Sequence, residues 1–170
     1  MIVRRLAEPD AEQFQTLRLR GLAEEETAFA SSFQEECDRP LDSIRVQLAP
    51  KADGAIFGAF EGEVLIAMVA VERESMKKLS HKGFIWGMYV APEWRSKGRG
   101  AQILQSALQH AWTELKVLQV NLGVHTLNAA ALKVYKAAGF EVFGTERGAL
   151  WVNGQPQDEH HMVCRAPSAA

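Results

Sequence analysis

The sequence predicts a single α/β domain in which short strands alternate with amphipathic helices. Three observations support this fold class. The chain has 170 residues, 47% hydrophobic and 24% charged, which is the balance of one globular domain with a buried core. Apolar runs at residues 56–60 and 64–71 are joined by Glu61-Gly62-Glu63, which predicts a hairpin. Apolar residues from Ile103 to Leu115 recur at steps of three and four, as on a helix with one buried face.

The remaining elements follow from the same periodicities and from turn residues. Strands are predicted at residues 3–6, 56–60, 64–71, 84–90, 117–124, 140–152 and 157–164. Helices are predicted at residues 9–21, at 40–48, from near Gly98 onward, and at 128–139. Residues 27–33 are predicted to form a loop or short turn. Asn153-Gly154 predicts a two-residue hairpin between the last two strands.

Composition and charge disfavour several classes of function. The formal net charge of −2 and the pI near 6.2 give no general attraction to nucleic acid or to an anionic membrane. No segment has the apolar length of a membrane span, and the N-terminal residues lack an apolar signal core, so we expect a cytoplasmic protein. The expected domain spans residues 1–166, followed by a loose tail at 167–170.

No metal site is predicted. Cys37 and Cys164 are too few for a disulfide framework and lack metal-ligand spacing, so we interpret both as reduced cysteines. His160 and His161 are adjacent on a strand and would point to opposite faces, and no further ligand pattern accompanies them.

The most informative segment is the basic, glycine-containing loop that follows the strand at 84–90 and precedes a helix. It consists of Arg95, Ser96, Lys97, Gly98, Arg99 and Gly100. Two glycines permit a tight turn, and the amides of the turn and of the first helical residues can then converge on phosphate oxygens. The three basic side chains add mobile positive charge. The spacing matches neither the P-loop nor the dinucleotide-binding loop.

A second segment, Asn128 to Phe140, has an N-cap residue at its start and Gly139 as a C′ residue, so that Phe140 can fold back onto Tyr135 or Val134. Together with Val90-Ala91-Pro92 and the loop Arg95-x-x-Gly98-x-Gly100, this pattern resembles the GNAT superfamily of N-acetyltransferases over nearly the whole chain. The resemblance implies a central mixed, mostly antiparallel sheet of about seven strands, splayed between strands four and five and flanked by about four helices.

The resemblance also implies the site. Acetyl-CoA would be the cosubstrate, with its pyrophosphate on the loop at residues 95–100 and its pantetheine arm paired with the backbone of Met88, Tyr89 and Val90. Asn128 and Tyr135 would be contributed by the later helix. Asn128 has both an N-cap and a cofactor-contact interpretation, which the sequence leaves open. For the side chains of Met88 and Tyr89, simple strand packing is an equal alternative.

The implied reaction is direct attack of a substrate amine on the acetyl thioester. Tyr135 is the predicted acid that protonates the leaving thiolate, with a hydroxyl that only hydrogen-bonds CoA as the alternative. A base or a water chain must take a proton from the amine. The sequence leaves this base open among water and six side chains: Glu35, Glu36, Glu72, Glu74, His160 and His161.

The acceptor is expected to be a primary amine of a small molecule or peptide. Trp86 lies two residues before Met88, hence on the same face of a regular strand, and is either an acceptor-pocket residue or a core residue. Acidic residues at 35–36 would favour a cationic acceptor. Two other classes remain: a non-catalytic acyl-CoA sensor, and, much less favoured by the charge, a nucleic-acid-binding module. Homodimers are common in the family, and the sequence locates no interface.

Overall fold

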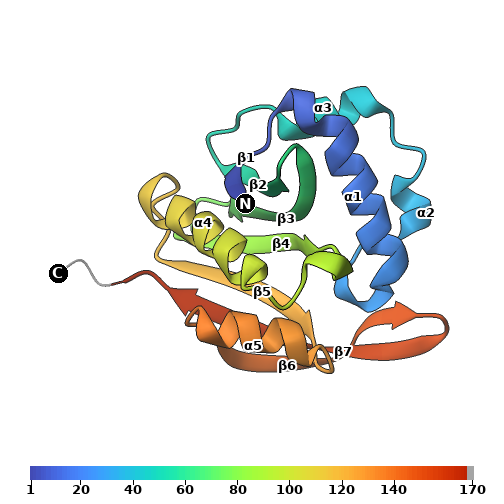
Figure 1. Ribbon diagram of the computed structural model, residues 1–170. Coiled ribbons are helices and arrows are strands. Elements are labelled where there is room, and N and C mark those ends of the chain that lie inside the picture. The colour runs from blue at the N-terminus through green and yellow to red at the C-terminus, as the bar shows by residue number, and fades with distance from the viewer. Residues whose placement is uncertain (168–170) are drawn as a thin grey trace.

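The computed structural model describes residues 1–167 as a seven-stranded sheet with helices on both faces (Figure 1). The strands are β1 Ile2–Arg5, β2 Gly54–Glu61, β3 Val64–Arg73, β4 Lys82–Val90, β5 Gln119–His125, β6 Glu141–Val152 and β7 Gln155–Arg165. The α-helices are α1 Ala11–Glu24, α2 Phe33–Glu36, α3 Leu41–Leu48, α4 Arg99–Thr113 and α5 Ala129–Ala137. Three 3₁₀ turns are η1 Glu8–Asp10, η2 Glu26–Ala28 and η3 Pro92–Trp94.

The sheet is mixed and mostly antiparallel, in the order β1-β2-β3-β4-β5-β7-β6. Its one parallel pair within the described residues is β4 with β5, and that pairing is short: residues 82–84 oppose residues 119–121. Beyond Phe84 the two strands separate. The predicted architecture, including the splay between strands four and five, is confirmed.

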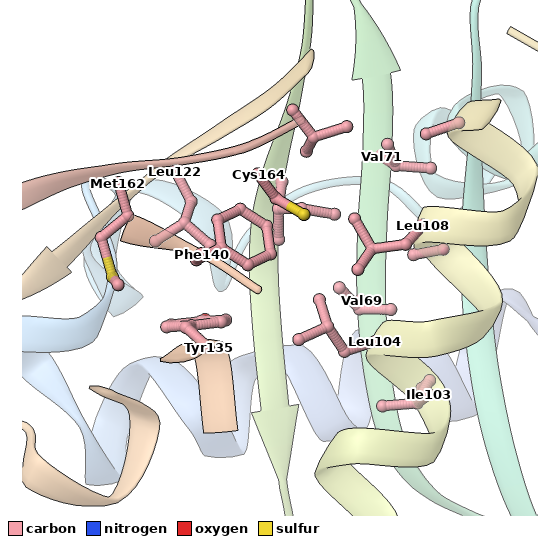
Figure 2. Close-up of a cluster of buried hydrophobic side chains, with 14 of the residues drawn as sticks. Val69, Val71, Ile103, Leu104, Leu108, Leu122, Tyr135, Phe140, Met162 and Cys164 are labelled. Carbon is pink, nitrogen blue, oxygen red and sulfur yellow. The ribbon is translucent and has the colours of Figure 1, made fainter. Parts of the chain in front are cut away.

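The sheet lies between two hydrophobic layers, because alternate residues of a strand point to opposite faces. Val69 and Val71 of β3 pack with α4 and α5, whereas Met68 and Ala70 pack with α1 and α3. Figure 2 shows the first layer, where Ile103, Leu104 and Leu108 of α4 face β3 while Tyr135 and Phe140 lie beside β5 and β7. Figure 1 shows α4 and α5 together on one face, with α1 on the other.

Most predicted elements lie within two residues of the observed ones. The helix predicted to end near Gly21 continues to Glu24, because Gly21 is buried in helical conformation and does not stop the helix. The segment after residue 27 contains the extra turn α2, which a capping box between Ser32 and Glu35 begins. Asn153 and Gly154 both have positive φ, as the predicted hairpin turn requires. Of the predicted tail at 167–170, residues 168–170 lie outside the described residues.

Candidate active site

The candidate site is a cavity of about 490 Å³ where β4 and β5 diverge. Its volume lies within the range of small-molecule sites. Arg18, Phe29 and Ser31 line it from the α1 layer, and Asn128, Ala131 and Tyr135 line it from the α5 layer. The gap between the two strands therefore joins the two faces of the sheet. Two molecules can enter it from opposite sides and meet.

A β-bulge in β4 shapes this gap. Tyr89 opposes Met68 while Trp86 opposes Ala70, so β4 has one more residue than β3 over this stretch. Gly87 has φ +64, a conformation that side chains rarely adopt, and it provides the irregular step. As a result Trp86 and Tyr89 pack in the α1 layer while Met88 packs in the α4 layer. The expectation that Trp86 and Met88 share a face is therefore wrong, because the bulge lies between them.

The predicted anion loop has the backbone of an anion-binding turn. Ser96 and Gly98 both have positive φ, at 63° and 72°, and Gly98 is the N-cap of the 15-residue helix α4. The amides of residues 96–101 donate to no acceptor in the described part of the chain. Free amides at the positive end of a long helix form an anion site.

Two of the three basic side chains of the loop are engaged in ion pairs. Arg95 donates to the Val90 carbonyl at 2.9 Å and pairs with Glu25 at 2.9 Å. The Arg99 guanidinium pairs with Glu61 at 3.2 Å, and its side chain is only 13% exposed, so it is not the mobile charge that the sequence led us to expect. Lys97 is exposed, with Nζ 5.9 Å from the centroid of the Trp94 ring.

On α5, Asn128 accepts a hydrogen bond from the Ala131 amide at 3.0 Å, so the N-cap interpretation is confirmed. Tyr135 is 7% exposed and lines the cavity, and its ring packs edge-on against Phe140 at 5.7 Å between centroids. Burial raises the pKa of Tyr135 to about 12, which keeps its hydroxyl protonated at neutral pH.

The β4 residues predicted to pair with pantetheine have one edge free, since β5 pairs only as far as Phe84. The Tyr89 side chain faces away from that edge: its hydroxyl donates to Glu24, and burial, followed by this carboxylate, raises its pKa. Met88 reaches toward the loop, where its Cε lies 3.4 Å from the position of a Cβ on Gly100. Val90 uses its carbonyl to accept from Arg95.

The six side chains considered as the base all belong to the described residues, and none lines the cavity. Glu35 caps α2 through the Ser32 amide at 2.7 Å, which lowers the pKa of its carboxyl. Glu36 is buried against Arg18; burial raises its pKa, but the Arg18 hydrogen bonds and charge outweigh it, and the net pKa is lowered.

The other four of these side chains lie elsewhere on the sheet. Glu72 opposes Phe84, beside the closed part of the gap, and Glu74 follows the end of β3. His160 hydrogen-bonds Thr145 at 2.8 Å, and His161 hydrogen-bonds Glu146 at 2.9 Å.

Glu159 of β7 is a cavity-lining carboxylate that the sequence did not indicate. Its Oε2 lies 3.0 Å from the position of a Cβ on Gly123 of β5, so the absence of a side chain on Gly123 gives the carboxylate room at this position. Its carboxylate has no hydrogen-bond partner within residues 1–167. Burial raises its pKa, His161 lowers it, and Glu146 raises it further, with a net rise. Among the candidate bases considered from the sequence, His160 is the neighbour of Glu159 in the chain.

Arg18 of α1 was also missed. It is 6% exposed, and it donates from Nε and Nη2 to the two carboxylate oxygens of Glu36, at 3.2 and 2.8 Å. Its third nitrogen, Nη1, is buried without a partner among the described residues and lies 3.3 Å from the position of a Cβ on Gly87. An arginine in the middle of an amphipathic helix gives no sequence signal that separates it from a surface residue.

These features fit a bound acyl-CoA. The unpaired amides suit a pyrophosphate, and the free edge of β4 leads from the loop into the cavity. No cluster of three or more metal-ligand side chains occurs within residues 1–167. No helix among them is long and apolar enough to cross a membrane.

The chain is similar to known acetyltransferases. Residues 19–140 match the family described as Acetyltransferase (GNAT) family. The L-amino acid N-acetyltransferase AaaT of Escherichia coli (strain K12) is 26% identical over 108 residues, which cover 64% of this chain and 65% of that protein.

Solved structures share the fold. A GNAT-family acetyltransferase from Streptococcus pneumoniae has a TM-score of 0.85 at 20% identity, over 97% of this chain and 99% of that one. The protein yncA from Salmonella typhimurium, solved with acetyl-CoA, has a TM-score of 0.81 at 16% identity, over 100% of this chain and 96% of that one.

Proposed function

The chain belongs to the acetyltransferase (GNAT) family, and from that premise we propose that it transfers an acetyl group from acetyl-CoA to a primary amine of a small molecule or peptide, with both substrates bound at once. The observation that carries the proposal is the cavity that joins the two faces of the sheet between β4 and β5. A direct transfer needs such a place, because acetyl donor and amine must come into contact away from bulk water.

The donor side is the α4–α5 face. The amides of residues 96–101 would bind the pyrophosphate, aided by the α4 dipole and by the charge of Lys97. The free edge of β4 at Met88 and Tyr89 would bind the pantetheine amides, and Asn128 lies in the cavity near the helix that carries Tyr135. When bound, acetyl-CoA supplies the acetyl group as an activated thioester.

Glu159 is the base we propose in place of the six side chains considered from sequence. An ammonium has no lone pair, so one proton must leave before attack. Glu159 offers an unpaired carboxylate inside the cavity, and its raised pKa brings it closer to neutrality, which makes it a better base than an exposed glutamate.

Tyr135 is the proposed acid. The amine nitrogen forms its bond to the acetyl carbon as the bond from that carbon to sulfur breaks, and the electron pair of the broken bond stays on sulfur. The first proton of the ammonium goes to Glu159 before the attack and passes from there to solvent. Tyr135 then gives its proton to the sulfur. When the amide forms, the nitrogen loses its second proton, which returns to Tyr135. The position of the Tyr135 hydroxyl in the cavity supports this role, whereas its raised pKa makes donation to a thiolate less favourable than from a tyrosine at the ordinary pKa.

The test is thiol release from acetyl-CoA across pooled amines, amino acids, polyamines and peptides, with acetyl-CoA binding measured by calorimetry. Turnover with one pool supports the transferase. Binding without turnover across a broad panel favours the second candidate, a non-catalytic acyl-CoA sensor that keeps the loop. Absence of acetyl-CoA binding would overturn both.

A further inference from the structure

We propose that Arg18 forms a carboxylate-binding subsite, so that the acceptor is an α-amino acid held by its carboxylate on the α1 side of the cavity. This inference rests on the proposed function, since it names the class of amine that the same cavity accepts. It begins from one atom, the unpartnered Nη1 of Arg18.

A buried arginine that uses only part of its hydrogen-bonding capacity is costly, because water has been removed from a charged donor and nothing has replaced it. The side chain of Arg18 is 7% exposed, and Glu36 takes two of its nitrogens. The rings of Phe29 and Trp86 lie 4.8 and 5.8 Å from the guanidinium carbon, which fixes its plane. Nη1 thus belongs to a rigidly held side chain that lines the cavity, and neither of its two N–H groups has an acceptor among the described residues.

The local charge favours an anion at this position. Glu36 is shared between Arg18 at 2.8 Å and Arg39 at 3.8 Å, so two guanidinium groups stand beside one carboxylate. A second carboxylate would balance the charge and complete the hydrogen bonding of Nη1. Arginine suits this task because its planar, permanently charged group matches a carboxylate.

The opposite wall offers the complementary charge. Nη1 lies against Gly87 of β4, whereas the Glu159 carboxylate lies against Gly123 of β5, on the other side of the gap. An α-amino acid presents an anion and an ammonium on the same carbon. With its carboxylate on Arg18, its ammonium points into a cavity whose other ionisable side chains are His125, Tyr135 and Glu159, of which Glu159 is the carboxylate. Phe29, Trp86 and Val124 surround the space with apolar surface, which suits an apolar side chain.

The experiment compares L-leucine with L-leucinamide and with isoamylamine, which lacks the carboxylate altogether. A charged hydrogen bond to a buried arginine predicts a kcat/KM for leucine about 10- to 150-fold above that for the amide. Calorimetry with N-acetyl-L-leucine and N-acetyl-L-leucinamide gives a readout without turnover, and the acid should bind more tightly by a similar factor.

The variant that removes the subsite is the double substitution Arg18→Gln with Glu36→Gln, which leaves no unpaired buried charge behind. It should reduce the preference for the acid to about twofold or less. Should the double variant not fold, Arg18→Lys keeps the charge without the planar group and should lower the same preference. The matched control is Arg20→Gln, in the same helix but with its guanidinium on exposed Glu24 and Glu93, and it should keep the full preference.

The outcomes separate this inference from the proposed function. Equal turnover of leucine, its amide and isoamylamine would overturn the subsite and leave the transferase standing. Preferential binding of N-acetyl-L-leucine that the double variant loses, without turnover of any amine, would support the subsite and remove the transferase. Absence of both turnover and binding would overturn the two together.

Discussion

Replacing Gly98 by alanine is expected to weaken acetyl-CoA binding by about 5- to 30-fold. Gly98 has φ +72, and no atom lies within 4 Å of the position that its Cβ would take. The added methyl group therefore meets no neighbour, and the whole cost is conformational. Holding an L-residue in the left-handed region costs about 1–2 kcal/mol. In an exposed loop that strain is relieved by a shift of the backbone.

A shift of the backbone lowers the fraction of molecules whose amides converge on the pyrophosphate. The apparent Kd rises by the inverse of that fraction, so 1–2 kcal/mol corresponds to about 5- to 30-fold. The assay is calorimetry with acetyl-CoA. The matched control is Gly154→Ala in the β6–β7 turn, where φ is +76 and no atom lies within 4 Å of the position of a Cβ. It carries the same strain outside the proposed site and should leave the Kd unchanged.

Two results would refute the reasoning. If Gly98→Ala bound acetyl-CoA as the unaltered protein does while its unfolding temperature fell, the loop would be strained without serving the cosubstrate. If Gly154→Ala weakened binding as much as Gly98→Ala, the effect would come from general destabilisation. The first outcome would remove residues 95–100 from the phosphate-binding role, and the second would show that the loss of binding does not come from the geometry of this loop.

Three further predictions concern the cavity. Tyr135→Phe should lower kcat by about 10²- to 10⁴-fold with little change in the Kd for acetyl-CoA, and unchanged kcat at saturating amine would exclude the acid role. Asn128→Ser should keep the helix cap, whereas Asn128→Ala should cost about 1 kcal/mol of stability. If both variants bound acetyl-CoA as tightly as the unaltered protein, Asn128 would be a helix cap alone. Glu159→Gln should lower kcat/KM by about 10²-fold or more yet gain stability over the unaltered protein as pH rises above 4.5. The sign of this effect follows because a pKa raised by folding means that the folded state binds the proton more tightly, so the unaltered protein loses stability as the Glu159 carboxyl ionises. A difference in unfolding temperature between the variant and the unaltered protein that is the same at pH 4 and pH 7 would contradict it.

Local patterns were sufficient for most of the fold. The apolar steps from Ile103 to Leu115 predict the buried face of α4, and the observed helix runs from Arg99 to Thr113. Asn128 and Gly139 delimit the observed helix α5, since capping depends only on residues near in sequence. The one-turn helix α2 was missed, although the Ser32 and Glu35 spacing that caps it is present in the sequence.

The error at Trp86 has a different origin. Alternation along a strand is reliable only while the strand is regular, and a bulge of one residue reverses every side chain beyond it. Gly87 was the available signal, because a glycine inside a strand pattern often marks a bulge. Glycine also occurs in regular strands, however, so the sequence alone does not distinguish a bulge from a regular strand. The pairing of β4 with β3 makes the distinction.

Arg18 and Glu159 were not predicted because their chemistry depends on hydrogen-bond partners that they lack in the folded protein. Each is a charged residue on an element whose pattern would place it at a surface, and each becomes unusual only because its neighbours leave it without a full set of partners. The divergence of β4 and β5 produces that condition for both, since it opens the sheet at Gly87 and Gly123, where a regular pair of strands would have closed it. The divergence that opens the proposed acetyl-CoA site therefore also places Arg18 and Glu159 on opposite walls of the cavity, where the proposed acceptor would enter.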